Sequence, residues 1–169
     1  MIYLLDANVI ITAKDSYYAI DQVPEFWSWL VHQGTAGHLK VPRETFDEVS
    51  PGPDRSHPFS VWRRDPATKA ALFFDEEPDP ALVAQVITQG YAPDLTDDEI
   101  TVIGADPFLV AYALAAPANR IVVTTEASAP SKKRQNRRLP DVCATMSVRC
   151  ITTFQLTRAL NFLTNWQAP

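Results

Sequence analysis

Short apolar runs separated by helical segments constrain the fold of this chain more than any other feature of its sequence. Ile2–Leu5 and Ile121–Thr124 are apolar almost throughout, which is typical of strands buried on both faces of a parallel sheet. Leu39–Val41 and Val148–Ile151 predict two further strands. Since helical segments separate these strands, we expect an α/β fold, a three-layer sandwich around a central, mostly parallel β-sheet.

Helical periodicity occupies most of the intervals between these strands. We expect helices over Asn8–Ala13, Pro24–Gln33, Ala81–Tyr91, Asp106–Ala115 and Asp141–Met146, one that begins at Pro42, and a C-terminal helix at about 153–166. Six prolines interrupt any long element in Pro51–Pro80, and we predict no function for that stretch. Because no credible linker divides the chain, residues 1–169 are expected to form one domain.

Composition excludes several classes of protein. With 46% hydrophobic and 21% charged residues the chain should fold, and no apolar run approaches the roughly 18 residues of a membrane span. The two cysteines lack zinc-finger spacing and no basic leader is present, which favours the cytoplasm. The five glycines form neither a G-x-G motif nor a P-loop, so dinucleotide and P-loop nucleotide binding are excluded.

Acidic residues follow the predicted strands at the ends where ligands bind in open parallel sheets. Asp6 ends the first strand, Glu48 lies on the helix after the second, and Asp106 begins a buried helix. Glu126 follows the third strand, and Asp141 opens the next short helix. Carboxylates that converge repel one another unless a cation holds them. The pattern therefore favours a cation site.

Each acid also has an ordinary structural explanation. Asp106 stands before Pro107 as an N-cap would, and Asp141 is a second candidate helix cap. Asp6 could form a strand-end turn, and Glu48 could be a surface residue. Because four acids at corresponding ends of successive elements are less easily explained in this way, we favour the cation site.

Four segments resemble the ordered motifs of PIN-domain nucleases, most closely an outlying subgroup of the VapC-like toxin ribonucleases. They are Ile2–Val9, Val41–Val49, Gly104–Ala113 and Val122–Glu126. The resemblance runs from residue 1 to about residue 151. It implies that Asp6, Glu48 and Asp106 are the catalytic and metal-binding acids.

The fourth acid of the implied site is open between two residues. Glu126 stands where the family more usually has Asp, and a longer insertion separates Asp141 from the last strand. We prefer Glu126 because it comes two residues after Thr124 at a strand end. By the same resemblance, Asn8 and Thr124 position the carboxylates.

Oxygen ligands without a cluster of His or Cys suit Mg²⁺ or Mn²⁺. Such ions activate water and neutralise phosphate oxygens, so we expect a metal-dependent endoribonuclease that hydrolyses RNA phosphodiester bonds. The resemblance further implies a cognate antitoxin protein and a homodimer. One alternative is a haloacid-dehalogenase-type phosphatase, which would need an acid where Asn8 stands. Another is a non-catalytic PIN-like module that binds RNA or protein.

A basic run lies between the two candidates for the fourth acid. Its members are Lys132, Lys133, Arg134, Arg137 and Arg138, a third of the 15 basic residues in a chain of net charge −5. We expect this run to bind RNA phosphates at the rim of the site, and Gln135 and Asn136 could contact base or sugar. The alternative is a solvated, flexible loop.

Overall fold

A four-stranded, wholly parallel sheet forms the centre of the molecule, in the order β2-β1-β3-β4. The computed structural model describes residues 1–167. The strands are β1 Ile2–Leu5, β2 Leu39–Lys40, β3 Arg120–Thr124 and β4 Cys150–Thr152. All four predicted strands are present, which confirms the α/β class and its parallel sheet.

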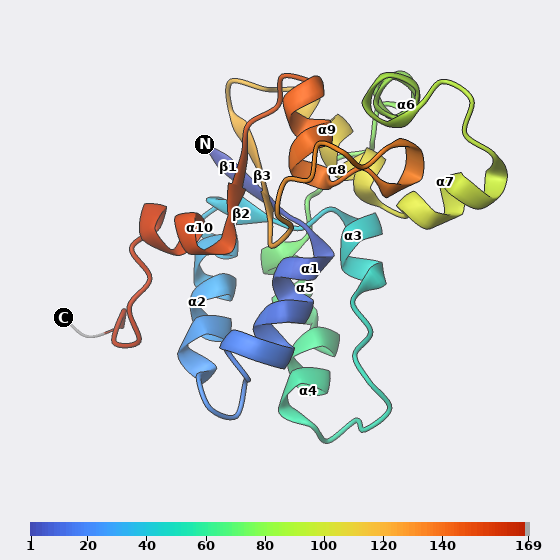
Figure 1. Cartoon of the computed structure of the whole chain (residues 1–169). Coiled ribbons are helices and arrows are strands. Elements are labelled where there is room, and N and C mark those ends of the chain that lie inside the picture. Colours follow the sequence, from blue (N-terminus) through green and yellow to red (C-terminus); the bar gives the residue numbers. More distant parts are fainter. Residues whose placement is uncertain (168–169) are drawn as a thin grey trace.

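Helices cover both faces of this sheet, which makes three layers (Figure 1). They are α1 Ala7–Thr12, α2 Pro24–Thr35, α3 Arg43–Glu48, α4 Pro58–Arg64, α5 Pro66–Leu72, α6 Pro80–Gln85, α7 Asp97–Ile103, α8 Asp106–Leu114, α9 Leu139–Thr145 and α10 Thr153–Ala159. π-Helical turns continue α1 over Ala13–Tyr17 and α6 over Val86–Tyr91. No helix in residues 1–167 is long and apolar enough to cross a membrane.

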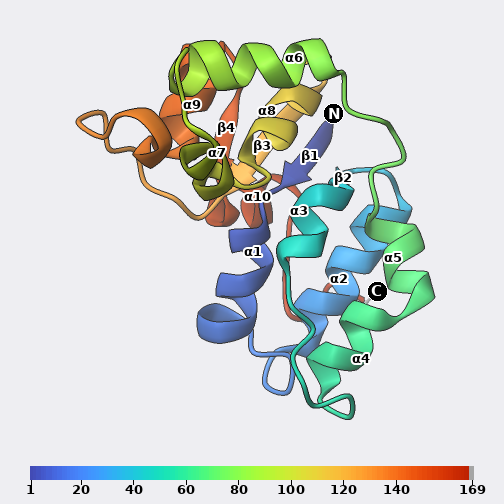
Figure 2. The ribbon, with the colours of Figure 1, turned by 90° about the vertical axis from the view of Figure 1, so that its right-hand side faces the viewer.

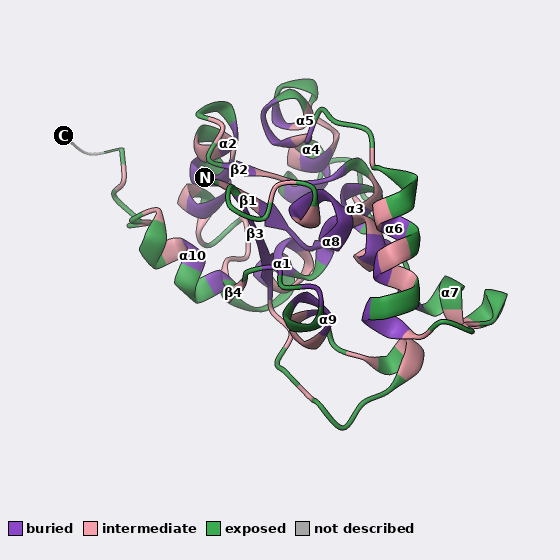
Figure 3. Cartoon of the chain, turned by 90° about the horizontal axis from the view of Figure 1, so that it is seen from above, coloured by how far each residue is buried: buried purple, intermediate pink, exposed green. Residues whose placement is uncertain are grey.

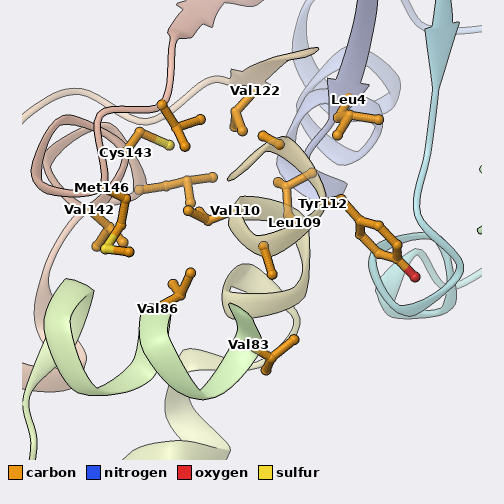
Figure 4. Packing of buried hydrophobic residues seen from close by; sticks show 14 of the residues in the cluster. Leu4, Val83, Val86, Leu109, Val110, Tyr112, Val122, Val142, Cys143 and Met146 are labelled. Carbon is orange, nitrogen blue, oxygen red and sulfur yellow. The ribbon is translucent and has the colours of Figure 1, made fainter. Parts of the chain in front are cut away.

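The alternating directions of strand side chains divide the core into two clusters. Leu4 and Val122 point to the face covered by α6, α8 and α9, where they pack near Leu109 (Figure 4). Leu5 and Val123 point to the opposite face, toward α1, α2 and α10. Figure 3 shows that the buried residues follow the strands and the inner sides of these helices. The sheet is therefore buried on both faces, as its apolar strands predict.

The predicted helices correspond to α1, α2, α3, α6 with its π-helical turn, α8 and α9, but other regions differ. The C-terminal helix ends at Ala159 and not at about residue 166, because Asn161 adopts a left-handed conformation (φ 51°) and Leu163 is 53% exposed. Helix α7 was not predicted, although a capping box between Thr96 and Glu99 begins it.

The proline-rich stretch forms two short helices, α4 and α5, which lie side by side below the sheet (Figure 2). Pro58 and Pro66 each occupy the first helical position, where a missing N–H is tolerated. The side chains of His57 and Asp65 cap the two helices. These prolines therefore start helices in this stretch.

Candidate active site

The carboxyl ends of β1 and β3 meet at the point where the chain leaves the sheet in two directions. From β1 the chain passes to β2 on one side, and from β3 it passes to β4 on the other. Such a switch point is where open parallel sheets bind ligands. Asp6 follows β1 here, and its N–H donates to the carbonyl of Val123 at 2.9 Å.

Two hydrogen bonds hold the carboxylate of Asp6 at this point. The hydroxyl of Thr124 donates to its Oδ2 at 2.6 Å, and the backbone N–H of Asn8 donates to Oδ1 at 3.3 Å. The side chain is 2% exposed, and this burial raises its pKa to about 6. Asp6 therefore caps α1, and Thr124 fixes the orientation of its carboxylate.

Asp106 is the first residue of α8, and it does not cap that helix. The N-cap is Ala105, without a side-chain hydrogen bond, so the capping explanation is wrong. Its carboxylate instead accepts a hydrogen bond from the Tyr91 hydroxyl at 3.1 Å. Burial, together with the charges of Asp6, Glu126 and Glu48, raises the pKa of Asp106 to about 8. The other three carboxylates therefore lie close enough for their charges to act on Asp106.

Glu48 ends α3 and reaches the start of α8 through an exposed side chain. Its Oε1 accepts a hydrogen bond from the backbone N–H of Ala105 at 2.8 Å. This contact depends on Gly104, since a Cβ there would lie 2.6 Å from the same oxygen. Gly104 also has φ of 55°, a conformation that favours glycine. Gly104 stands two residues before Asp106, a spacing that could have identified its role from sequence.

The proline-rich stretch supplies the group that fixes the end of α3. Arg63 of α4 is 8% exposed and donates to the carbonyls of Phe46 and Val49 at 2.7 and 3.0 Å. Its guanidinium also lies 3.6 Å from the centre of the Phe46 ring and 3.6 Å from Asp47. Phe46 and Asp47 precede Glu48 in the chain, and Val49 follows it. Arg63 thus anchors the turn that carries Glu48, a role that sequence reasoning missed.

Glu126 and Asp141 have different environments. Asp141 accepts hydrogen bonds from the Ser128 hydroxyl and the Ala129 N–H, which lower its pKa, and it does not cap α9 as the alternative predicted. Glu126 accepts from the N–H of Leu139 at 2.8 Å, and its charge acts on both Asp6 and Asp106. This arrangement supports Glu126 as the fourth acid.

Three of the five residues in the basic run contact other parts of the protein. Arg134 binds both oxygens of Glu99 at 2.7 Å and also Asp94 at 2.7 Å. Arg137 donates to the carbonyls of Gly90 and Asp141 and to the Thr145 hydroxyl, and Arg138 pairs with Glu126 at 3.1 Å. Within residues 1–167, Lys132 and Lys133 form no ion pair. The prediction of phosphate contacts therefore rests most firmly on these two lysines.

The basic run and the acids share a pocket. A cavity of about 230 Å³ is lined by Asp106 and Glu126 on one side and by Lys132, Gln135 and Asn136 on the other. Arg137 and Arg138 complete its basic wall. A larger pocket of about 360 Å³, between the end of α1 and residues 51–60, includes none of the five predicted acids. Of these two cavities, only the smaller one contains any of the predicted acids, and residues of the basic run line it as well.

The donor set fits a hydrated divalent cation. In the described part of the chain, neither Asp6 nor Asp106 forms an ion pair, although both are largely enclosed carboxylates whose burial disfavours a negative charge. No group of three His, Cys, Asp or Glu residues among residues 1–167 is arranged as a ready metal cage. Mg²⁺ commonly binds through one or two carboxylates and keeps several waters, so a closed cage is not required.

The fold and site define an α/β protein with an acidic pocket at the switch point of a parallel sheet. The profile of the family described as "Domain of unknown function (DUF4411)" matches residues 3–164, and the chain therefore belongs to this family. No curated protein matches the chain.

Proposed function

We propose that this protein is a metal-dependent endoribonuclease that hydrolyses RNA phosphodiester bonds. The observation that carries the proposal is the arrangement of four acids around the switch point: Asp6 is hydrogen-bonded to Thr124 at the end of β3, Glu48 to the residue before Asp106, and Asp106 and Glu126 line one cavity. A haloacid-dehalogenase-type phosphatase would need an acid where Asn8 stands. A binding module without a metal would not need four carboxylates whose charges repel one another. The resemblance to PIN-domain nucleases supports the same reaction.

The residues of the site have distinct tasks in this proposal. Asp6, Glu48 and Asp106, with Glu126, would hold Mg²⁺ or Mn²⁺. The ion would supply a Lewis acid that activates water and neutralises the non-bridging phosphate oxygens. Thr124 holds the Asp6 carboxylate in place by its hydroxyl group. Lys132 and Lys133 would attract the phosphates on either side of the cleaved bond.

The finer parts of the proposal rest on the resemblance alone. The VapC-like ribonucleases are toxins of toxin–antitoxin pairs, so we propose a cognate antitoxin protein and a homodimer as partners. Co-purification with the product of a neighbouring gene would support the antitoxin. A protein that cleaves RNA but has no such partner would keep the nuclease proposal and remove the toxin proposal.

The proposal is tested by comparing two substrates under the same conditions. We expect Mn²⁺-dependent cleavage of single-stranded RNA, no hydrolysis of para-nitrophenyl phosphate, and loss of cleavage in Asp6→Asn. Asp141→Asn is the matched control, because this carboxylate contacts Ser128 and Ala129 and not the other acids. Hydrolysis of para-nitrophenyl phosphate without RNA cleavage would favour a phosphatase. RNA binding without cleavage would favour the non-catalytic module.

A further inference from the structure

A second pocket adjoins Glu126 and is lined by no residue of the basic run. It measures about 200 Å³ and is lined by Thr124 and Glu126 from the site, and by Cys150, Ile151 and Gln155 beyond it. Glu126 lines this pocket and the basic one, so the two pockets meet at this carboxylate. A strand of nucleic acid with a phosphate at the acids would extend into both.

The walls of this second pocket suit a nucleobase better than a phosphate. Pro140 and Ile151 supply apolar surface, and no Lys or Arg lines the pocket. Gln155 and Ser128 supply polar edges. The Oε1 of Gln155 accepts from the Thr152 N–H at 2.8 Å, which leaves its amide NH₂ as a donor at the wall. A flat ring with polar edges matches this combination.

An exposed aromatic pair includes a chain neighbour of two residues that line this pocket. Tyr17, at the end of the π-helical turn after α1, and Phe154, in the first turn of α10, lie with ring centroids 5.3 Å apart. They are 51% and 49% exposed, unlike the buried aromatic residues of the core. Phe154 lies between Thr152 and Gln155 in the chain, two residues that line the second pocket.

Helix α1 connects this pair to the acids. Its first residue follows Asp6, and the hydroxyl of Thr12 lies 3.5 Å from that of Thr125, next to Glu126. The helix then continues through its π-helical turn to Tyr17. The aromatic pair is therefore tied to the acids through α1 and to the second pocket through the first turn of α10.

We infer that the second pocket and the Tyr17–Phe154 pair form a subsite that binds unpaired bases of single-stranded nucleic acid. This inference rests on the proposed function and adds the contacts by which the site would recognise a strand whose bases are free to turn out of a helix. Aromatic side chains stack on any base, because every base has a π-face. Bases paired in a duplex are not available for this contact, so the subsite selects single strands over duplexes.

Binding measurements on the full-length protein test the subsite apart from catalysis. Asp106→Asn serves as the background, so that substrate is not cleaved. The probes are a fluorescein-labelled 12-nucleotide single-stranded RNA, the same sequence as a duplex, and an abasic strand of equal length. Tyr17→Ala and Phe154→Ala should each weaken binding of the single strand about tenfold, since base stacking contributes about 1–3 kcal/mol per base.

Three controls separate stacking from other effects. Phe154→Trp should keep the affinity, because an aromatic ring remains. Val61→Ala, at a 56% exposed apolar residue on α4, should change nothing. The abasic strand should bind the alanine variants and the background protein equally, because it has no bases to stack. Melting temperatures and sedimentation of each variant check folding and assembly.

The outcomes distinguish the subsite from the proposed function. Alanine variants that bind the single strand as tightly as the background, while the wild type still cleaves RNA, would overturn the subsite alone. Equal losses for the abasic strand would also overturn it. Altered sedimentation with unchanged RNA affinity would assign the aromatic pair to contact between copies. A background that binds no RNA, with a wild type that cleaves none, would overturn both proposals.

Discussion

The acidic site lies between two arginine-bearing segments, helix α4 of the proline-rich stretch and the basic run at residues 132–138. In α4, Arg63 is directed inward, and its guanidinium bonds to backbone carbonyls at the end of α3. In the basic run, Arg134 and Arg138 instead pair with the carboxylates of Glu99 and Glu126. Arg63 is buried, whereas the side chains of Arg134 and Arg138 are 39% and 47% exposed.

Arginine side chains therefore have different structural roles in the two segments. A buried arginine on backbone carbonyls fixes the position of a chain segment, and its removal leaves those carbonyls without partners. An exposed arginine beside a carboxylate neutralises a charge and contributes little stability. The number of basic residues in a loop therefore overstates the positive charge that remains free to attract a ligand.

The largest effect should come from the acids between the two segments. Burial and neighbouring charges raise the pKa of Asp106 from 3.8 to about 8. Between these values the folded state binds more protons than the unfolded state, so metal-free stability should fall as pH rises from about 4 to about 8. At about 1.4 kcal/mol per pKa unit, and with repulsion shared among the acids, we expect a loss of a few kcal/mol.

Urea unfolding in EDTA at pH 5 and at pH 8.5 measures this loss. Asp106→Asn should flatten the profile and be the more stable protein at pH 8.5. Asp141→Asn, which removes a carboxylate with a lowered pKa, should not flatten it. An equally flat profile in the wild type would show that the acids remain solvated and apart.

The next largest effect should come from Arg63. Arg63→Met keeps much of the apolar stem but leaves the carbonyls of Phe46 and Val49 unpaired, at a cost of about 2–3 kcal/mol. Arg64→Gln is the neighbouring control, because Arg64 donates to the carbonyl of Gly52 instead. Arg138→Gln should cost less than Arg63→Met. If urea unfolding showed equal losses of stability for Arg63→Met and Arg138→Gln, the distinction between the two segments would be removed.

Gly104→Ala should act on Glu48 from the opposite side. Its left-handed backbone and the close oxygen of Glu48 predict a loss of about 1–2 kcal/mol together with weaker Mn²⁺ binding. Gly37→Ala is a matched control, since Gly37 has φ of 76° and nothing within 4 Å of an added Cβ. Gly37→Ala should lose stability without any change in Mn²⁺ affinity. If both variants bind Mn²⁺ normally, Glu48 is not a ligand.

The smallest effect on stability should come from the lysines of the basic run. Lys132→Gln and Lys133→Gln should each raise KM for RNA at low salt and retain kcat, since they act on binding. Each lost phosphate contact should flatten the log–log salt dependence of binding by about 0.7. Arg134→Gln should leave this slope unchanged, because Arg134 is already paired with Glu99 and Asp94. If Arg134→Gln flattened the salt dependence of binding more than the lysine variants did, the ranking of these residues as phosphate contacts would be reversed.

Much of the fold could be predicted from the sequence because its strands are short apolar runs between helices. The ends of the elements also located Asp6, Asp106 and Glu126, since strand ends in a parallel sheet share one edge. Helix α7 was missed because five of its seven residues are exposed, so it has no apolar stripe. The C-terminal helix was drawn too long because the spacing of Leu156, Leu160 and Leu163 does not show where the backbone turns.

Contacts between distant segments could not be predicted. Arg63 and Phe46 are separated by 17 residues, and Glu48 and Ala105 by 57. Nothing local in the sequence marks Arg63 as different from Arg64, although one is buried against α3 and the other bonds to a loop carbonyl. The partners of the arginines in the basic run depend on the placement of α7 and α9, which sequence periodicity does not provide.

The proposed reaction requires that the acids at the switch point bind a divalent cation. Calorimetric titration of Mn²⁺ into the full-length protein at pH 7.5, in two buffers of different ionisation enthalpy, tests it directly. The claim predicts binding with proton release, because metal-bound carboxylates must ionise and the pKa of Asp106 is about 8 without metal. Asp106→Asn should lose this binding and its proton release, whereas Asp141→Asn should keep both. Equal binding by the wild type and Asp106→Asn, or none by either, would contradict the claim.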